Sequence, residues 1–192
     1  MKYKPRVKII CFILLLTFLL GVISAPLANA YNYQGLHWPG TSTYWAFDDY
    51  APVPTSWQTP IISAATTWNN AGSRFRFIRD EALGGALGYT VRYYPWGQDG
   101  YIAMTVRSYN SNNVIVSCYT RFNKSYPWST SGGAGAYDVQ NCATHEFGHW
   151  LALEHVSDTE ATMYAWIYFA ETKKRTLLLD DVNGIKAIYG SQ

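Results

Sequence analysis

The stretch that decides the fold of this chain is His145–His155, which reads HEFGHWLALEH. In an α-helix, residues four positions apart differ by a net rotation of about 40°. His145 and His149 therefore lie on one face, one turn apart, and their imidazoles can converge on one metal ion. Glu146 lies about 100° from His145 around the same helix, which places its carboxylate beside such an ion rather than on it.

The third histidine of this stretch requires a sharp turn of the chain. A continued helix would put His155 about 9 Å beyond His149, too far for a bond of about 2.0 Å to the same ion. Three histidines with one position left for water form the catalytic pattern of zinc, and Glu146 could handle the proton of that water. Of the four histidines only His37 lies outside this stretch, so we expect one zinc ion.

Shortly after His155 the chain reads ATMY at Ala161–Tyr164, so that Met163 lies eight residues after His155. The histidine motif followed by such a methionine resembles the metzincin zinc peptidases, in which a methionine turn lies beneath the metal. Met163 matches that turn. Within this clan the chain most resembles the matrixins, including secreted bacterial ones, because Tyr137–His149 (YDVQNCATHEFGH) is similar to their active-site helix and Asp180–Gly190 (DDVNGIKAIYG) to their closing helix.

The resemblance implies an α/β fold of the metzincin (zincin) type, with a twisted, mixed five-stranded sheet, an antiparallel edge strand and three helices. It also implies a zinc endopeptidase in which Glu146 takes a proton from the attacking water and delivers it to the leaving amine. An extended peptide substrate would lie along the edge strand, at Tyr101, Ile102, Ala103 and Met104, with Tyr164 lining the pocket for the side chain after the scissile bond. Family analogy leaves Ca²⁺ open, with isolated acids at Asp99, Asp138 and Asp158.

One departure from the family keeps an alternative open. Ala152 stands where the family has glycine, and a positive φ there would cost alanine about 1 kcal/mol. The first alternative is therefore a zinc-binding homologue without turnover. A second alternative, suggested by sixteen tyrosines and eight tryptophans, is a secreted adhesion or carbohydrate-binding module.

The N-terminus reads as a secretory signal. Four basic residues precede the apolar run Ile9–Ile23, and Ser24–Ala30 (SAPLANA) has the small residues that a signal peptidase needs. A membrane anchor is the alternative, but fifteen residues span only about 22 Å of a hydrocarbon core near 30 Å. We therefore expect residues 1–30 to be removed, leaving residues 31–192 as one secreted domain without stable membrane insertion.

Secretion into an oxidising compartment determines the expected state of the cysteines. Cys11 would leave with the signal, and Cys118 and Cys142 would remain as the only two thiols. An even pair in an oxidising space favours a disulfide. The alternative is two buried free thiols.

The balance of charge in residues 31–192 indicates which partners the protein has. Residues 31–192 contain eleven basic and thirteen acidic side chains, which argues against a nucleic-acid partner. We expect a monomer that acts on proteins or peptides.

The hydrophobic pattern predicts helices at Ser56–Ala71 (capped by Ser56 or Thr59, with Pro60 in its first turn), at 137–152 and at Asp180–Tyr189 (capped by Asp180). It predicts strands at Thr43–Phe47, Arg74–Arg79, Tyr89–Tyr94, Tyr101–Val106 and Val114–Asn123.

Overall fold

The computed structural model describes residues 31–192 and confirms the mixed five-stranded sheet. The strand order is β3-β2-β4-β6-β5, in which β5 alone runs antiparallel to its neighbour and forms one edge. The strands are β2 (Ser42–Phe47), β3 (Arg76–Arg79), β4 (Thr90–Tyr94), β5 (Ala103–Tyr109) and β6 (Ile115–Asn123). The predicted strands are therefore all present, and their ends differ from the prediction by at most three residues.

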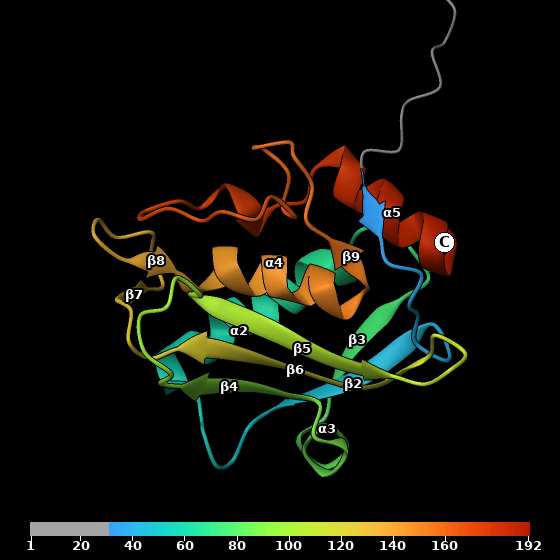
Figure 1. Ribbon diagram of the computed structural model, residues 1–192, viewed down its shortest axis with the longest axis horizontal. Coiled ribbons are helices and arrows are strands. Elements are labelled where there is room, and N and C mark those ends of the chain that lie inside the picture. Colours follow the sequence, from blue (N-terminus) through green and yellow to red (C-terminus); the bar gives the residue numbers. More distant parts are fainter. Residues whose placement is uncertain (1–30) are drawn as a thin grey trace, which may run out of the picture.

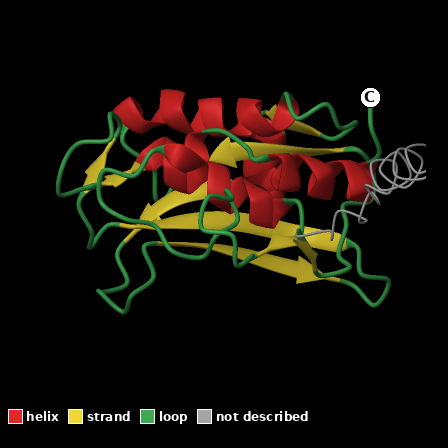
Figure 2. Ribbon diagram, turned by 90° about the horizontal axis from the view of Figure 1, so that it is seen from above, coloured by secondary structure: helices red, strands yellow, loops and turns green. Residues whose placement is uncertain are grey.

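The helices α2 (Thr55–Asn69) and α4 (Val139–Trp150) cover one face of this sheet (Figure 1). Seen from above, the helices run roughly along the strands (Figure 2). On the opposite face lies α3 (Glu81–Leu87), and near the C-terminus lies α5 (Leu179–Tyr189). The described residues thus hold four α-helices, one more than predicted. The additional helix α3 is fixed by its ends, because Asp80 accepts a hydrogen bond from the Leu83 N–H and Gly88 adopts a left-handed conformation.

The helix α2 buries the predicted face, but its start differs from the prediction. The buried residues are Trp57, Ile61, Ala64, Ala65 and Trp68. The helix begins at Thr55, after Pro54, and no side chain caps it. Pro60 consequently lies beyond the first turn, where its ring nitrogen cannot donate to the preceding turn. The prediction of a Ser56 or Thr59 cap was wrong.

The start of α5 also differs from the prediction. It is Asp181, not Asp180, that accepts the hydrogen bond from the Leu178 N–H, at 2.8 Å. The same Asp181 oxygen accepts the Thr162 N–H at 3.1 Å. Asp181 therefore both begins α5 and ties it to the segment before Met163.

Two short strand pairs position the histidine segment. The strand β1 (Asn32–Tyr33) pairs antiparallel with β9 (Leu153–Glu154), which lies between the second and third histidines. Near the other end of α4, β7 (Trp128–Ser129) pairs parallel with β8 (Tyr137–Asp138). Both ends of the helix that carries His145 and His149 are therefore held by backbone pairing.

The predicted disulfide is not formed, because Cys118 and Cys142 are both free and buried. Cys118 lies on β6 and Cys142 in the first turn of α4, and no bond joins their sulfur atoms. A disulfide forms only where the two Cα atoms lie within about 7 Å and the Cβ atoms face each other. Two thiols on separate elements meet that condition only if the packing of the helix on the sheet brings them together. Both side chains instead fill the apolar core, where burial raises the pKa of each thiol well above its usual value.

No helix in residues 31–192 is long and apolar enough to cross a membrane. The predicted signal peptide at residues 1–30 lies outside the described residues.

Candidate metal centre

The three motif histidines converge on one point. His155 Nε2 lies 3.2 Å from His145 Nε2 and 3.2 Å from His149 Nε2, and the three candidate ligand atoms all lie within 4.8 Å of one another. Tetrahedral zinc with bonds of about 2.1 Å separates its nitrogen ligands by about 3.4 Å. The donor set and its spacing therefore fit a single zinc ion.

The opposite nitrogens of two of these rings are also fixed. His145 Nδ1 donates to the Thr162 carbonyl at 2.7 Å, and His149 Nδ1 donates to the Leu153 carbonyl at 2.8 Å. This arrangement leaves each Nε2 without a proton and turned toward the shared point. Burial lowers the pKa of His145 well below its usual value and that of His149 to about 3. Both rings are therefore neutral and ready to bind a cation.

The turn that brings in His155 is made at Ala152. Its φ is 65°, in the left-handed region. Its N–H donates to the His149 carbonyl at 3.0 Å, so that α4 ends and the chain changes direction. Alanine thus adopts the conformation that glycine prefers at this position, and His155 still reaches the other two histidines.

Glu146 lies beside the histidines and is held by a threonine on the edge strand. Thr105 Oγ1 lies 2.6 Å from Glu146 Oε2 and 2.7 Å from Thr120 Oγ1. Burial raises the pKa of Glu146 to about 7, although the Thr105 hydroxyl and the charges of Lys174 and Arg107 act in the opposite direction. A carboxyl group with a pKa near neutrality is suited to both accepting and releasing a proton.

Met163 packs directly against the helix that carries the two histidines. At Gly148, one residue before His149, a Cβ would lie 2.2 Å from Met163 Sδ and 3.0 Å from Trp68. Only glycine allows this approach, so the methionine lies against α4 rather than at the open side of the histidines. The Met163 carbonyl also accepts the Val156 N–H at 3.1 Å, which ties the methionine turn to the segment just after His155.

Arg107 clamps the segment between the second and third histidines. Its guanidinium donates to the His149 carbonyl at 2.5 Å and to Gln34 Oε1 at 3.1 Å, and forms an ion pair with Glu154. Glu154 immediately precedes His155. One side chain from β5 therefore contacts the backbone before the Ala152 turn and the Glu154 carboxylate after it.

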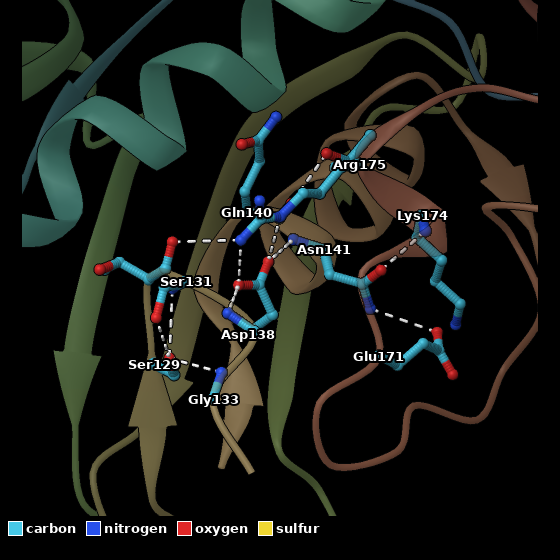
Figure 3. Close-up of polar contacts among 12 residues, drawn as sticks. Ser129, Ser131, Gly133, Asp138, Gln140, Asn141, Glu171, Lys174 and Arg175 are labelled. Atoms are coloured by element: carbon cyan, nitrogen blue, oxygen red, sulfur yellow. Dashed lines mark hydrogen bonds and ion pairs between the residues drawn. The ribbon is translucent and has the colours of Figure 1, made fainter.

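The N-terminal end of α4 is fixed by a buried carboxylate (Figure 3). Asp138 accepts the Asn141 N–H at 2.9 Å and forms an ion pair of 2.5 Å with Arg175. The Asn141 side chain then accepts the Lys174 N–H at 2.7 Å and donates to Glu171 at 3.2 Å. The start of the helix and residues 171–175 are thereby joined into one unit.

The histidines lie in a cleft of about 650 Å³. Tyr101, Ile102, Ala103 and Met104, which the resemblance placed at the substrate, all line it. Tyr164 does not line it. The residues just after Tyr164 line the cleft. The Tyr164 carbonyl accepts a hydrogen bond from Lys174 Nζ at 2.5 Å.

Sequence reasoning missed three side chains near this centre: Thr105, Arg107 and Lys174. Each contacts the histidine segment or the cleft wall from a distant part of the chain. Alternation along β5 puts Thr105 and Arg107 on one face, which is the only sequence signal for them. Nothing in the sequence marks Lys174.

The histidine triad, the adjacent glutamate and the methionine packed against their helix define a zinc-binding domain of the metzincin type. A family model described as matrixin matches residues 43–190, and the chain belongs to this family. It is 39% identical to metalloendoproteinase 1 of Glycine max over 154 residues (76% of this chain, 43% of the relative). It is 42% identical to human neutrophil collagenase over 69 residues (36% and 14%), and 24% identical to human matrix metalloproteinase-26 over 148 residues (72% and 53%). The chain thus spans about half, or less, of the length of these relatives.

Proposed function

We propose that this chain is a zinc-dependent endopeptidase that acts outside the cell after removal of residues 1–30. The observation that carries the proposal is the convergence of three Nε2 atoms, with His155 3.2 Å from each of the other two. Glu146 lines the same cleft and is not one of the three grouped ligands. Three ligands and a free carboxylate match the catalytic rather than the structural pattern of zinc sites.

The three histidines, Glu146 and Thr105 have separate roles in the proposed reaction. Zinc held by the three histidines would polarise the peptide carbonyl and lower the pKa of water. Glu146 takes the proton of the attacking water on its carboxylate and delivers it to the leaving amine. The Thr105 hydroxyl holds that carboxylate in place through its 2.6 Å hydrogen bond.

The substrate mode follows from the position of β5. This strand is the last of the sheet and pairs with β6 on one side only. The start of β5 and the residues before it line the zinc cleft. An extended peptide can therefore add to this edge through backbone hydrogen bonds, while its side chains enter pockets of the cleft.

The pocket beside the zinc site has a wall fixed by one lysine. Ala165, Trp166 and Ile167 line the cleft. Lys174 Nζ donates to the Tyr164 carbonyl at 2.5 Å and to the Trp166 carbonyl at 2.7 Å, and the lysine is almost fully buried. We assign this wall, rather than the Tyr164 ring, to the side chain that follows the scissile bond.

Substitution of Glu146 tests the proposal. We compare wild type with Glu146→Gln on an unfolded protein substrate, after measuring zinc content in both. Glu160→Gln serves as the matched control, because Glu160 is exposed and pairs with Lys173 at the surface. We expect Glu146→Gln to bind zinc in equal amount and to cleave at least 100-fold more slowly. Glu160→Gln should cleave at the wild-type rate.

Two outcomes would overturn the proposal. Stoichiometric zinc in a wild-type protein that cleaves nothing would indicate a zinc-binding homologue without turnover. Equal cleavage by wild type and Glu146→Gln would remove Glu146 from the mechanism.

A further inference from the structure

A second hollow, of about 410 Å³, lies on the face of the sheet turned away from α2 and α4. Side chains alternate along β4 and β6, so that Val91 and Phe122 are buried on one side while Arg92 and Arg121, which are paired in register, lie on the other. The lining consists of Asp48, Tyr50, Ala51, Arg92, Tyr94, Tyr119 and Arg121. None of these residues lines the zinc cleft.

The Arg121 guanidinium has no oxygen acceptor within residues 31–192. Its one hydrogen bond runs from Nη2 to Met104 Sδ at 3.5 Å, and thioether sulfur is a weak acceptor. Arg121 Nε is buried without a partner. Arg92, by contrast, is paired with Asp48 at 2.7 Å and bonded to Thr90 at 2.8 Å. The lining therefore carries one excess positive charge.

Aromatic rings hold both guanidinium groups in place. The Arg121 guanidinium carbon lies 5.2 Å from the Trp96 ring centre and 5.9 Å from that of Tyr119. The Arg92 guanidinium carbon lies 4.4 Å from the Tyr119 ring centre. Such cation–π contacts fix a guanidinium without using its N–H groups. The Nη groups of Arg121 thus make no bond to an oxygen, and a carboxylate matches their paired N–H groups.

The surroundings favour a sugar over a peptide as the carrier of that carboxylate. The strands β4 and β6 are both paired on both sides, so a peptide cannot add to them through its backbone. Tyr94 is half-exposed and Tyr50 fully exposed. Both line the hollow and offer flat apolar surfaces on which a pyranose ring can stack.

We propose that this outer-face hollow binds a carboxylated saccharide, with a uronate carboxylate on Arg121 and a sugar ring against Tyr94 and Tyr50. The site is separate from the zinc cleft, so the protein can hold an acidic polysaccharide while the cleft stays open to its own substrate.

Titration calorimetry with trigalacturonate on the zinc-loaded protein tests this site. Fully methyl-esterified trigalacturonate is the matched ligand, because it keeps the rings and removes the charges. Among the protein variants, Arg121→Gln removes the free guanidinium and Tyr94→Ala removes an exposed ring. Arg74→Gln is the charge-matched control, since Arg74 is exposed and donates to the Ser191 carbonyl away from the hollow.

We expect wild type and Arg74→Gln to bind trigalacturonate equally. Arg121→Gln should bind it about 10- to 100-fold more weakly, as expected for a charged hydrogen bond. Tyr94→Ala should weaken binding several-fold without changing thermal stability, which separates ligand contact from misfolding. The methyl ester should bind wild type no better than Arg121→Gln binds the acid.

Several results would overturn the assignment. No binding by wild type, or unchanged binding by both Arg121→Gln and Tyr94→Ala, would remove the site. Equal losses for Arg74→Gln and Arg121→Gln would indicate general charge attraction. A triglutamate peptide that binds as tightly as trigalacturonate would show an acidic-peptide site instead.

Discussion

The turn at Ala152 provides a sharp test of how the third histidine is placed. Ala152 has a φ of 65° and is completely buried. Two substitutions probe it in opposite directions. Ala152→Gly relieves the backbone strain, whereas Ala152→Val places a β-branched side chain in a left-handed conformation within a closely packed site.

For Ala152→Gly the expected contributions to the free energy of unfolding nearly cancel, whereas for Ala152→Val they add. Glycine removes a left-handed penalty of about 1–2 kcal/mol. It also gives up a buried methyl group, about 0.8 kcal/mol, and about 0.4–1 kcal/mol through greater freedom of the unfolded chain. The net change is therefore within about 1 kcal/mol of zero. Valine adds overpacking of about 1–3 kcal/mol to a greater φ penalty, so we expect a loss of at least about 2 kcal/mol.

Urea unfolding of the zinc-free protein measures these changes, and chelator competition measures zinc affinity in parallel. We expect Ala152→Gly to keep wild-type zinc affinity and Ala152→Val to lose both stability and affinity. A loss above about 2 kcal/mol in Ala152→Gly would mean that the methyl contacts, and not the turn geometry, hold this segment. Wild-type stability in Ala152→Val would mean that the positive φ is not required.

Three further predictions concern the surroundings of the histidines. Thr105→Val should lower kcat about tenfold with unchanged zinc content, because the carboxylate of Glu146 loses one hydrogen bond. Thr105→Ser should retain the rate in the same peptide-cleavage assay, and an unchanged rate in the valine variant would contradict this role. Arg107→Gln should weaken zinc binding about 10- to 100-fold in chelator competition, since the carbonyl of His149 and the carboxylate of Glu154 lose their shared donor; equal affinity would exclude the clamp. The zinc-free protein should lose stability as the pH falls from 7 to 5, because burial lowers the pKa of His149 to about 3 and only the unfolded chain then binds the proton. Urea unfolding should show a shallower pH dependence in His149→Gln, and a parallel slope would refute this origin.

The sequence by itself determined the features that depend on local spacing. The four-residue interval between His145 and His149 places both rings on one helical face. The alternation of residues 74–79 marks a strand, and the buried face of α2 follows from the period of Trp57, Ile61 and Trp68. The order of such elements indicates an α/β fold with mixed strand directions, and the resemblance carried by the motif implies the family and its five-stranded sheet.

Other features were decided only by the tertiary structure, because they join residues far apart in the chain. Thr105 meets Glu146 across 41 positions, and Arg107 meets Glu154 across 47. The state of Cys118 and Cys142 was also decided by the tertiary structure. The prediction of a disulfide rested only on the even number of cysteines and on the oxidising compartment. A disulfide needs two Cα atoms within about 7 Å of each other, and whether Cys118 on β6 and Cys142 on α4 meet that condition is decided by how the helix packs on the sheet, which leaves both thiols free. The local sequence pattern determines which face of a helix or strand a side chain lies on. Which distant residues it contacts on that face is determined only by the packing of the whole chain.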